Sequence, residues 1–406
     1  MKILRLSSRD IQKLCERYYC NKKRVIKKVS KIIEDVRADG DRAVLKYTRR
    51  FDKVKLSPKD LRVSISDINA AYQNIDTDFI ASLKAIIANI EKFHRKQLPR
   101  QWKIKEEDGA EIGEIFRPIE NVGVYVPAGT APLVSSVYMS VLPAKIAGVK
   151  RIILATPPSR GGNVDPHILV VADLLKVDEV YRIGGAQAIA ALAFGTKTVP
   201  KVDKIVGPGN DYVTEAKRQV FGYVDIDMLA GPSEVVILAN QFSDKDYVLG
   251  DLLAQAEHFK GLAVLVTTSK KFAKAMKKET EKGYIVLVKN LEQAVEVINR
   301  IAPEHLEILI KRPDRIIKKI KNAGAIFIGP YSPVCIGDYI AGPSHVLPTG
   351  GTARFFSGLG VRSFIKSLHT ISYSRKALEK EKAALDNMTK IEGLQKHLDS
   401  FRARFR

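Results

Sequence analysis

The sequence has few cysteines and no long apolar run, and both shortages exclude classes of protein. Its three cysteines, Cys15, Cys20 and Cys335, form no CxxC pair and no even-numbered framework. We therefore expect free thiols in a reducing cytoplasm, and the favoured interpretation of Cys335 is a small buried side chain. No apolar run reaches the ~18–20 residues of a membrane span. The first residues have no apolar core of signal-peptide length, so a cytoplasmic location without a membrane partner is expected.

Standard nucleotide-binding motifs are also missing. The chain contains no complete GxGxxG and no GxxxxGK[ST], and "GPGNDY" (207–212) and "GLGVRS" (358–363) keep only the first two glycines. The run "RIGGAQAIAALAFG" (182–195) follows an expected strand and opens an expected helix, which would direct backbone N–H groups at an anion. A tight turn that needs glycine explains this run equally well. A dinucleotide bound by this chain would be held in an unorthodox way.

What the chain has in excess is positive charge. Lys and Arg number 67 against 45 Asp and Glu, so the formal net charge is +22. Such a charge permits a nucleic-acid-binding protein. However, the basic residues are spread along the whole chain, and aromatic residues are not interleaved with them as a stacking platform requires. No nucleic-acid partner is expected, and this class stays as an alternative.

The pattern of apolar residues predicts an α/β protein. Residues 1–100 have mostly helical spacing, whereas short β-branched runs alternate with helical stretches from about 120, and again after 240. Such alternation indicates parallel sheets covered on both faces, with functional loops at the carboxyl ends of the strands. We predict two Rossmann-like (doubly wound, incomplete) α/β domains, with an N-terminal helical segment and a helical C-terminal tail. The predicted domains are an N-terminal helical region joining the second α/β domain (1–120), a first α/β domain (121–236), a second α/β domain (237–364) and a tail reaching a partner subunit (365–406).

Two histidines in acid-rich stretches with helical spacing are candidates for metal-binding or catalytic residues. In "LLAQAEHFKG" (252–261), Gln255 and His258 are three residues apart on one helix face and can reach one metal ion. The alternative is a helix end with a dipole-stabilised histidine. In "APEHLEI" (302–308), Glu304 and His305 can be a general base and a neighbour that tunes it. The alternative for this pair is an exposed helix start after Pro303.

Two further stretches carry polar side chains. The glycine-rich segment 334–360 holds Asp338 and His345, and loops of this length are usually functional or disordered. The apolar residues within it favour order. Near the end of the tail, "IEGLQKH" places Glu392 and His397 five residues apart, within reach of one site across an interface. Together, one Gln, one Asp and two His make an oxygen and nitrogen set suited to zinc.

Eight motifs, taken together, make the chain resemble the histidinol dehydrogenase family from about residue 25 to 400. In chain order they are "VGVYVPAGTAPLVSSVYMSVLPAKIAGV", "GGAQAIAALAFGT", "VDKIVGPGNDYVTEAKRQVFG", "DMLAGPSEVVILA", "QAEH", "APEHLEI", "GDYIAGPSHVLPTGGTARFFSGLGV" and "EGLQKH". The resemblance implies the last step of histidine biosynthesis, in which L-histidinol, two NAD⁺ and water give L-histidine and two NADH through histidinaldehyde. Ala128 and Phe259 depart from the family pattern, since a glycine and an acidic residue are usual there.

The resemblance also implies roles for individual residues. The metal ligands for one Zn²⁺ per subunit would be Gln255, His258, Asp338 and His397, with His397 supplied by the partner subunit of a homodimer. His305 would be the general base, and Glu304 would activate water. The remaining implied contacts are Ser233, His345 and Glu392 to the substrate, and Tyr125, Gln187 and Asn210 to NAD.

Elementary chemistry agrees with this assignment. Zinc is redox-inert and binds neutral imidazole and amine nitrogens, which histidinol supplies, so NAD must carry the hydride. Removing the hydroxyl proton is general-base work, for which histidine suits neutral pH. Two rival hypotheses remain besides nucleic-acid binding. One is a paralogous NAD-dependent dehydrogenase of another small polar alcohol, and the other is a metal hydrolase that uses Glu304 on zinc-bound water.

Overall fold

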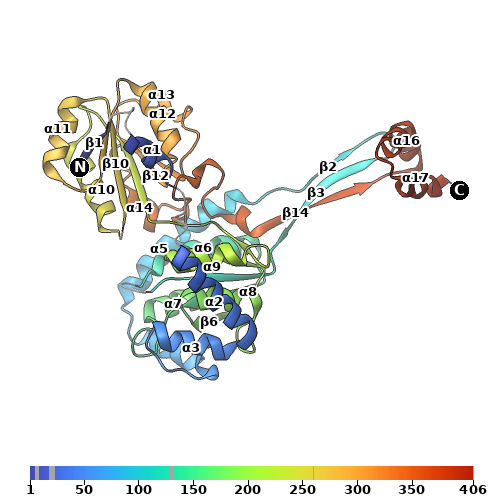
Figure 1. Ribbon diagram of the computed structural model, residues 1–406, viewed down its shortest axis with the longest axis horizontal. Helices are drawn as coiled ribbons and strands as arrows, with labels where there is room; N and C mark the ends of the chain where they lie inside the picture. Colours follow the sequence, from blue (N-terminus) through green and yellow to red (C-terminus); the bar gives the residue numbers. More distant parts are fainter. Residues whose placement is uncertain (5–8, 18–22, 129–131, 259, 406) are drawn as a thin grey trace. The chain divides into compact units, whose positions relative to one another are not determined.

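The computed structural model describes residues 1–4, 9–17, 23–128, 132–258 and 260–405. The interpretations of Cys20 and Phe259 lie outside the described residues. The chain forms two compact units: unit 1 contains Met1–Gln97 and Ile119–Phe364, and unit 2 contains Leu98–Pro118 and Ile365–Arg406. The α/β fold class is confirmed, because unit 1 contains two separate parallel sheets with helices packed on them (Figure 1).

The first sheet has five parallel strands in the order β6-β5-β4-β7-β8. Its strands are β4 (Asn121–Tyr125), β5 (Arg151–Thr156), β6 (Glu179–Arg182), β7 (Lys204–Val206) and β8 (Asp225–Ile226). The helices between them are α6 (Val134–Ala147), α7 (Pro166–Leu174), α8 (Gly185–Phe194) and α9 (Asp211–Val220). The strands β4, β5 and β7 are rich in Val and Ile and are mostly buried on both faces, as expected for a covered parallel sheet.

The second sheet has six parallel strands in the order β1-β11-β10-β9-β12-β13. Its strands are β1 (Lys2–Leu4), β9 (Glu234–Leu238), β10 (Leu262–Thr267), β11 (Tyr284–Leu287), β12 (His305–Ile308) and β13 (Ala325–Ile328). The helices are α1 (Arg9–Cys15), α10 (Lys245–Glu257), α11 (Lys270–Glu279), α12 (Leu291–Ile301), α13 (Asp314–Ile317) and α14 (Val334–Tyr339). One core joins one face of the sheet to α1, α12 and α13, and a second core joins the other face to α10 and α11.

The N-terminal residues divide between the two sheets. β1 and α1 belong to the second sheet and its core. By contrast, α2 (Lys23–Asp39) and α3 (Asp41–Phe51) share a core with α8 and α9 at the first sheet. α4 (Ile65–Tyr72) packs on α7 and α5 (Thr77–His94) packs on α6. The short 3₁₀ turns of unit 1 are η1 (Pro58–Asp60), η2 (Arg95–Gln97), η3 (Thr352–Arg354) and η4 (Val361–Phe364). The domain boundaries given above remain predictions.

Unit 2 contains a three-stranded antiparallel sheet that the sequence did not indicate. Its order is β14-β3-β2, and the strands are β2 (Trp102–Lys105), β3 (Glu111–Pro118) and β14 (Ile365–Ser372). The helical part of the tail therefore begins only after β14. It consists of α15 (Arg375–Lys380), α16 (Lys382–Ile391), α17 (Gln395–Arg402) and the 3₁₀ turn η5 (Ala403–Phe405).

Membrane spans and cysteines were further sequence expectations. Among the described residues, no helix is both long and apolar enough to cross a membrane. Cys15 is a free, buried cysteine, whereas Cys335 is free and exposed. The expectation of a buried Cys335 is therefore wrong: the residue lies in the first turn of the short helix α14, of which no residue is buried.

Candidate active site

Glu304 and His305 lie at the start of a buried strand. The alternative of an exposed helix start is wrong, because His305 opens β12, which pairs in parallel with β9 and β13. Glu304 is 6% exposed and His305 is 3% exposed. A strand segment of only four residues, interrupted by charged side chains, gives too little alternation to be distinguished from a helix start.

The Glu304 carboxylate is held by two donors that precede or begin β9. Ser233 Oγ donates to Glu304 Oε2 at 2.8 Å, and the Glu234 backbone N–H donates to the same oxygen at 2.7 Å. Burial raises the pKa of Glu304 to about 7, although the His305 charge and these two hydrogen bonds oppose the increase. A carboxyl group with such a pKa exchanges a proton near neutral pH, as a general acid or base must.

The His305 ring is fixed in one tautomer by its backbone contact. Its Nδ1 lies 3.0 Å from the Glu234 carbonyl oxygen, which can only accept, so Nδ1 carries a proton. Nε2 is then the ring nitrogen that can take up a proton, and it lies 3.5 Å from Asp338 Oδ1. Burial by itself lowers the pKa of His305, but the charges of Glu304 and Asp338 together raise it to about 9.

Asp338 and His345 belong to the glycine-rich segment, which contains the helix α14 and an ordered loop. His345 Nδ1 donates to the Asp338 carbonyl oxygen at 2.9 Å, and His345 Nε2 lies 3.4 Å from Ser136 Oγ on α6. Burial lowers the pKa of His345. A neutral imidazole at this place can accept a hydrogen bond from a ligand with the nitrogen that faces Ser136.

Gln255 and His258 are neighbours at the end of α10, where the His258 backbone N–H donates to the Gln255 carbonyl oxygen. The helix ends at Glu257, and His258 is an extended C-cap residue (φ −65°, ψ 137°). Gln255 is 4% exposed, and its Nε2 has no hydrogen-bond partner among the described residues. Gly261 lets the chain turn closely around both residues, because a Cβ at 261 would collide with the Gln255 carbonyl oxygen and approach the His258 Cβ at 3.1 Å.

The structure brings most of the candidates of unit 1 to one place. Ser233, Glu304, His305, Asp338 and His345 are connected by the contacts given above. On β12, Leu306 and Ile308 face the core with α12, so His305 points to the other face, on which α10 packs. Gln255 and His258 are at the end of that helix. No group of three or more His, Cys, Asp or Glu side chains suited to a metal ion occurs within the described parts of the chain.

Glu392 and His397 belong to unit 2, so their meeting with the other candidates remains a prediction. The sequence suggested that one helix carries both residues, but the structure places them on two different elements. Glu392 is the C-cap of α16, Gly393 follows with a positive φ of 69°, and His397 lies on α17. Both side chains are exposed.

The candidate NAD contacts gather at the carboxyl ends of β4, β6 and β7. The Tyr125 hydroxyl accepts a hydrogen bond from the Gly185 N–H at 3.0 Å, and burial raises its pKa to about 12. Gln187 is 1% exposed, and neither its Oε1 nor its Nε2 has a partner among the described residues. Asn210 caps α9 by accepting from the backbone N–H groups of Tyr212 and Val213.

An ion pair that no sequence motif indicates holds the loop after β7. Lys217 and Asp227 form a buried ion pair, and both hold Gly207: Lys217 Nζ donates to its carbonyl oxygen at 2.9 Å, and Asp227 Oδ2 accepts from its N–H at 2.8 Å. Gly207 has φ +115°, and a Cβ there would collide with the Tyr125 carbonyl oxygen. The sequence signal that could have indicated this ion pair is the lysine in the helical stretch "DYVTEAKRQV", which the structure shows to be buried.

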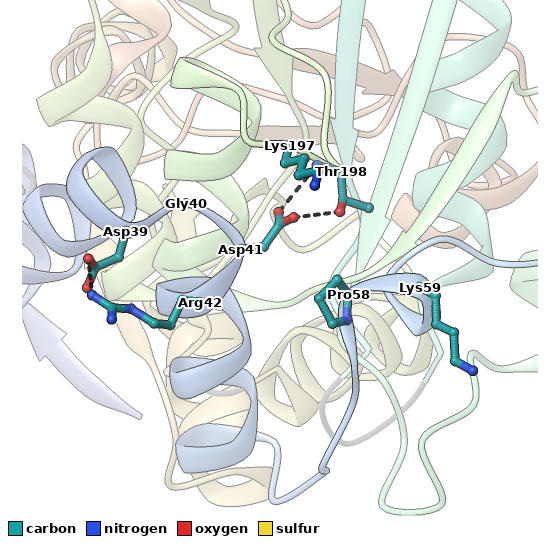
Figure 2. Close-up of a pocket in the computed structure, with 8 residues that line it drawn as sticks. All are labelled: Asp39, Gly40, Asp41, Arg42, Pro58, Lys59, Lys197 and Thr198. Carbon is teal, nitrogen blue, oxygen red and sulfur yellow. Dashed lines mark hydrogen bonds and ion pairs between the residues drawn. The ribbon is translucent and has the colours of Figure 1, made fainter.

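A pocket of about 610 Å³ lies elsewhere, at the N-terminus of α3 (Figure 2). Its lining consists of Asp39, Gly40, Asp41, Arg42, Pro58, Lys59, Lys197 and Thr198. The Asp41 carboxylate in this pocket already has a hydrogen-bond partner, since its Oδ2 accepts from Thr198 Oγ1 at 2.6 Å (Figure 2). None of the candidate residues lines this pocket, and it is not part of the candidate site.

Comparisons with known proteins identify the family of the chain. The sequence profile of the histidinol dehydrogenase family matches residues 15–405. The chain belongs to the histidinol dehydrogenase family. It is 48% identical over 404 residues to the histidinol dehydrogenase of Listeria monocytogenes serovar 1/2a, covering 95% of this chain and 94% of that protein. It is 46% identical over 414 residues to that of Clostridium acetobutylicum, covering 97% and 96%.

A solved structure extends the similarity to the fold. The crystal structure of histidinol dehydrogenase from Elizabethkingia anophelis matches with a TM-score of 0.94 and 35% identity, covering 100% of this chain and 98% of that chain. The chain is therefore an oxidoreductase of an NAD-dependent family, as the sequence predicted.

Proposed function

We propose that this chain catalyses the four-electron oxidation of L-histidinol to L-histidine through histidinaldehyde, with zinc and two NAD⁺, as the last step of histidine biosynthesis. The observation that carries the proposal is the pair of buried residues Glu304 and His305, together with the partly buried Ser233 and Asp338 that contact them. The pair contains a histidine whose tautomer leaves Nε2 as proton acceptor, and a carboxyl group whose pKa lies near neutrality. These are the two proton-transfer groups that oxidation of an alcohol and hydration of an aldehyde require.

The residues of unit 1 fit a zinc ion. Gln255 is buried and its Nε2 has no partner among the described residues, so nothing there prevents the amide from turning its oxygen toward an ion; His258 is its neighbour around Gly261. Asp338 supplies a carboxylate at 3.5 Å from the base His305. Amide oxygen, imidazole nitrogen and carboxylate oxygen form a donor set compatible with zinc. We propose that Gln255, His258 and Asp338 hold the ion together with His397 of the partner subunit.

The first sheet carries residues that fit a dinucleotide. Gln187 has a buried amide without a partner in the first turn of α8, and Asn210 caps the N-terminus of α9. Both helix N-termini point backbone N–H groups toward the edge of the sheet where an anionic group is favoured. Tyr125 lies between them, and we propose these three residues as NAD contacts.

In the proposed mechanism, zinc held by Gln255, His258, Asp338 and the partner's His397 would supply the charge that orients the amino alcohol, and NAD⁺ held at the first sheet would supply the hydride acceptor. His305 takes the hydroxyl proton at Nε2, while the Glu234 carbonyl keeps Nδ1 protonated. Glu304, held by Ser233 and the Glu234 N–H, removes a proton from the water that adds to the aldehyde. His345 and Glu392 contact the substrate. Burial of Glu304 and His305 limits the access of bulk water to the two proton-transfer groups.

We also propose a homodimer in which unit 2 packs on the partner subunit. Unit 2 exposes large apolar side chains on its sheet and helices, and a small unit of this kind needs a partner to cover them. The most exposed are Trp102, Ile104, Ile371, Met388 and Ile391. His397 and Glu392 lie in the same unit. A cytoplasmic location is proposed as well, and the unpaired Cys15 and Cys335 agree with a reducing compartment.

The deciding experiment is absorbance at 340 nm on mixing the protein with L-histidinol and NAD⁺, before and after a zinc chelator. The expected result is two NADH for each histidine formed, loss of turnover with the chelator and recovery with added zinc. Turnover of another small polar alcohol with one NADH would favour the paralogous dehydrogenase. Hydrolysis without NAD would favour the metal hydrolase, and salt-dependent DNA binding without a metal requirement would favour the nucleic-acid-binding alternative.

A further inference from the structure

Two carboxyl groups meet under α10, beside the candidate active site, and the proposed mechanism does not use them. The Asp251 carboxyl on α10 lies within hydrogen-bonding distance of the Glu307 carboxyl on β12. Glu307 is fully buried, and its Oε1 accepts from the Val334 N–H at 3.0 Å. Its other oxygen, Oε2, is buried and has no donor among the described residues.

A single proton resolves this arrangement. Two carboxylates accept hydrogen bonds but donate none, so an ionised pair would leave Glu307 Oε2 without a partner and place two negative charges together in the interior. One proton between them supplies the missing donor. The direction of the pKa shifts agrees: burial raises the pKa of both groups, and the Asp251 charge contributes to raising that of Glu307 to about 8.

The pair also joins the three elements that carry the candidate residues. Gln255 follows Asp251 by four residues on α10, and Asp338 follows Val334 by four residues on α14, so each lies about one helical turn from the pair. His305 precedes Glu307 by two residues on β12 and therefore points to the same face of the sheet. Gln255, His305 and Asp338 are thus each carried by an element that one of the two carboxyl groups belongs to or contacts.

We propose that Asp251 and Glu307 are positioning residues that share one proton and thereby fix the relative places of Gln255, His305 and Asp338. The inference rests on the proposed function, since it assigns the pair a role in holding the metal-ligand set and the base. Among the described residues, Cys335 of α14 and His305 of β12 are the other titratable groups that interact with the pair.

The test compares three variants of the full-length protein. Glu307→Gln keeps an oxygen for the Val334 N–H and gives an amide that donates to Asp251, so it imitates the protonated carboxyl. Glu307→Ala removes both interactions. Leu252→Ala, a buried core residue on the same helix, is the control for general destabilisation. The readouts are zinc affinity in a chelator competition, kcat with histidinol, and the unfolding temperature. The fourth readout, called the infrared band below, is the part of the protonated carboxylic acid band that a Glu304→Gln variant leaves in place, because the Glu304 carboxyl, with a pKa of about 7, contributes the rest.

Glu307→Ala is expected to weaken zinc affinity or kcat by about 10–100-fold, as loss of groups that orient metal ligands usually does. Glu307→Gln should stay close to the wild type in both, while the infrared band disappears. Leu252→Ala should lower only the unfolding temperature. A Glu307→Ala protein that is destabilised but retains zinc affinity and kcat overturns the positioning role. A Glu307→Gln protein as impaired as Glu307→Ala, or a wild type without the infrared band, overturns the shared proton.

Two arrangements keep the test decisive. If Glu307→Ala does not fold, Asp251→Ala and Asp251→Asn replace the alanine and glutamine variants with the same expectations. The infrared band requires neither zinc nor substrate. A wild type that shows the band but binds no zinc therefore contradicts the proposed metal site, not the shared proton, and kcat then remains the measure of positioning.

Discussion

The two parallel sheets of unit 1 have the same winding but carry their candidate residues at opposite edges. Apart from the edge strand β1 of the second sheet, each sheet starts at an inner strand, adds two strands on one side, and then places the next strand against the first: β7 beside β4, and β12 beside β9. At the first sheet, Tyr125 ends β4 and the Gly207 loop follows β7. At the second sheet, Ser233 precedes β9, and Glu304 precedes β12.

The helix ends at these two edges explain the difference in chemistry. At the carboxyl edge of the first sheet, α8 and α9 begin, and their N-termini favour anions such as the phosphates of a dinucleotide. At the amino edge of the second sheet, α10 ends beside Gln255 and His258, and a helix C-terminus favours a cation. The sequence-based expectation that functional loops lie at carboxyl ends therefore applies to the first sheet only.

Replacing the base at the second sheet is the strongest way to test this division. His305→Ala removes the only described group whose Nε2 is placed to take the hydroxyl proton, so kcat should fall by about 10²–10⁴-fold. Zinc content and the KM for NAD⁺ should be unchanged, because neither depends on that nitrogen. Steady-state kinetics and metal analysis measure both.

The matched control is His167→Ala, a partly exposed histidine on α7 that hydrogen-bonds Asp165. Its turnover should equal that of the wild type. If His305→Ala turns over histidinol at the wild-type rate, His305 has no part in proton transfer and the site at the amino edge must be reassigned.

At the first sheet, the largest effect is expected from the buried ion pair. Asp227→Ala leaves the Lys217 ammonium without its carboxylate in the interior, and breaking a buried pair typically costs ~3–5 kcal/mol of folding stability. The Gly207 loop also loses an acceptor, so the KM for NAD⁺ should rise. Urea unfolding and kinetics measure the two effects.

A nearby ion pair provides the comparison. Asp225→Ala removes the partner of the buried Lys204, but the Asp225 side chain is about half exposed and water reaches the pair, so the loss should be smaller than that of Asp227→Ala. Equal losses for the two variants would mean that Asp227 has no special role in holding the loop.

The pH dependence tests the contact between Glu304 and His305. The base must be neutral to accept a proton, so turnover should rise as pH increases through the His305 pKa. The Glu304 charge contributes to raising that pKa to about 9. Glu304→Gln removes the charge, so the pKa should fall and the acidic limb of the first oxidation should move to lower pH. A pre-steady-state pH series of the first NADH formed measures this, and an unmoved limb would contradict the electrostatic coupling.

The sequence was sufficient for most of the strands that are buried on both faces, because runs of β-branched residues marked them. It was insufficient for β12, where Glu307 and His305 alternate with Leu306 and Ile308 over only four residues. The strands of unit 2 were missed for another reason: their side chains are mostly exposed and their pairing joins residues 111–118 to 365–372. The candidate site residues came from family motifs, whereas the contacts of Asp251 and Lys217 depend on distant pairing that no local pattern indicates.

The smallest expected effect concerns Asn210, the cap of α9. Two variants distinguish its role as a helix cap from a role as an NAD contact. Asn210 accepts from the N–H groups of Tyr212 and Val213, so Asn210→Ala should cost ~1 kcal/mol of stability. Asn210→Asp keeps the capping oxygen but places a negative charge where a dinucleotide would approach. If Asn210 also contacts NAD, the aspartate variant should retain stability and show the larger increase in the KM for NAD⁺. If both variants differ from the wild type in stability alone, the carboxyl edge of the first sheet binds NAD without Asn210.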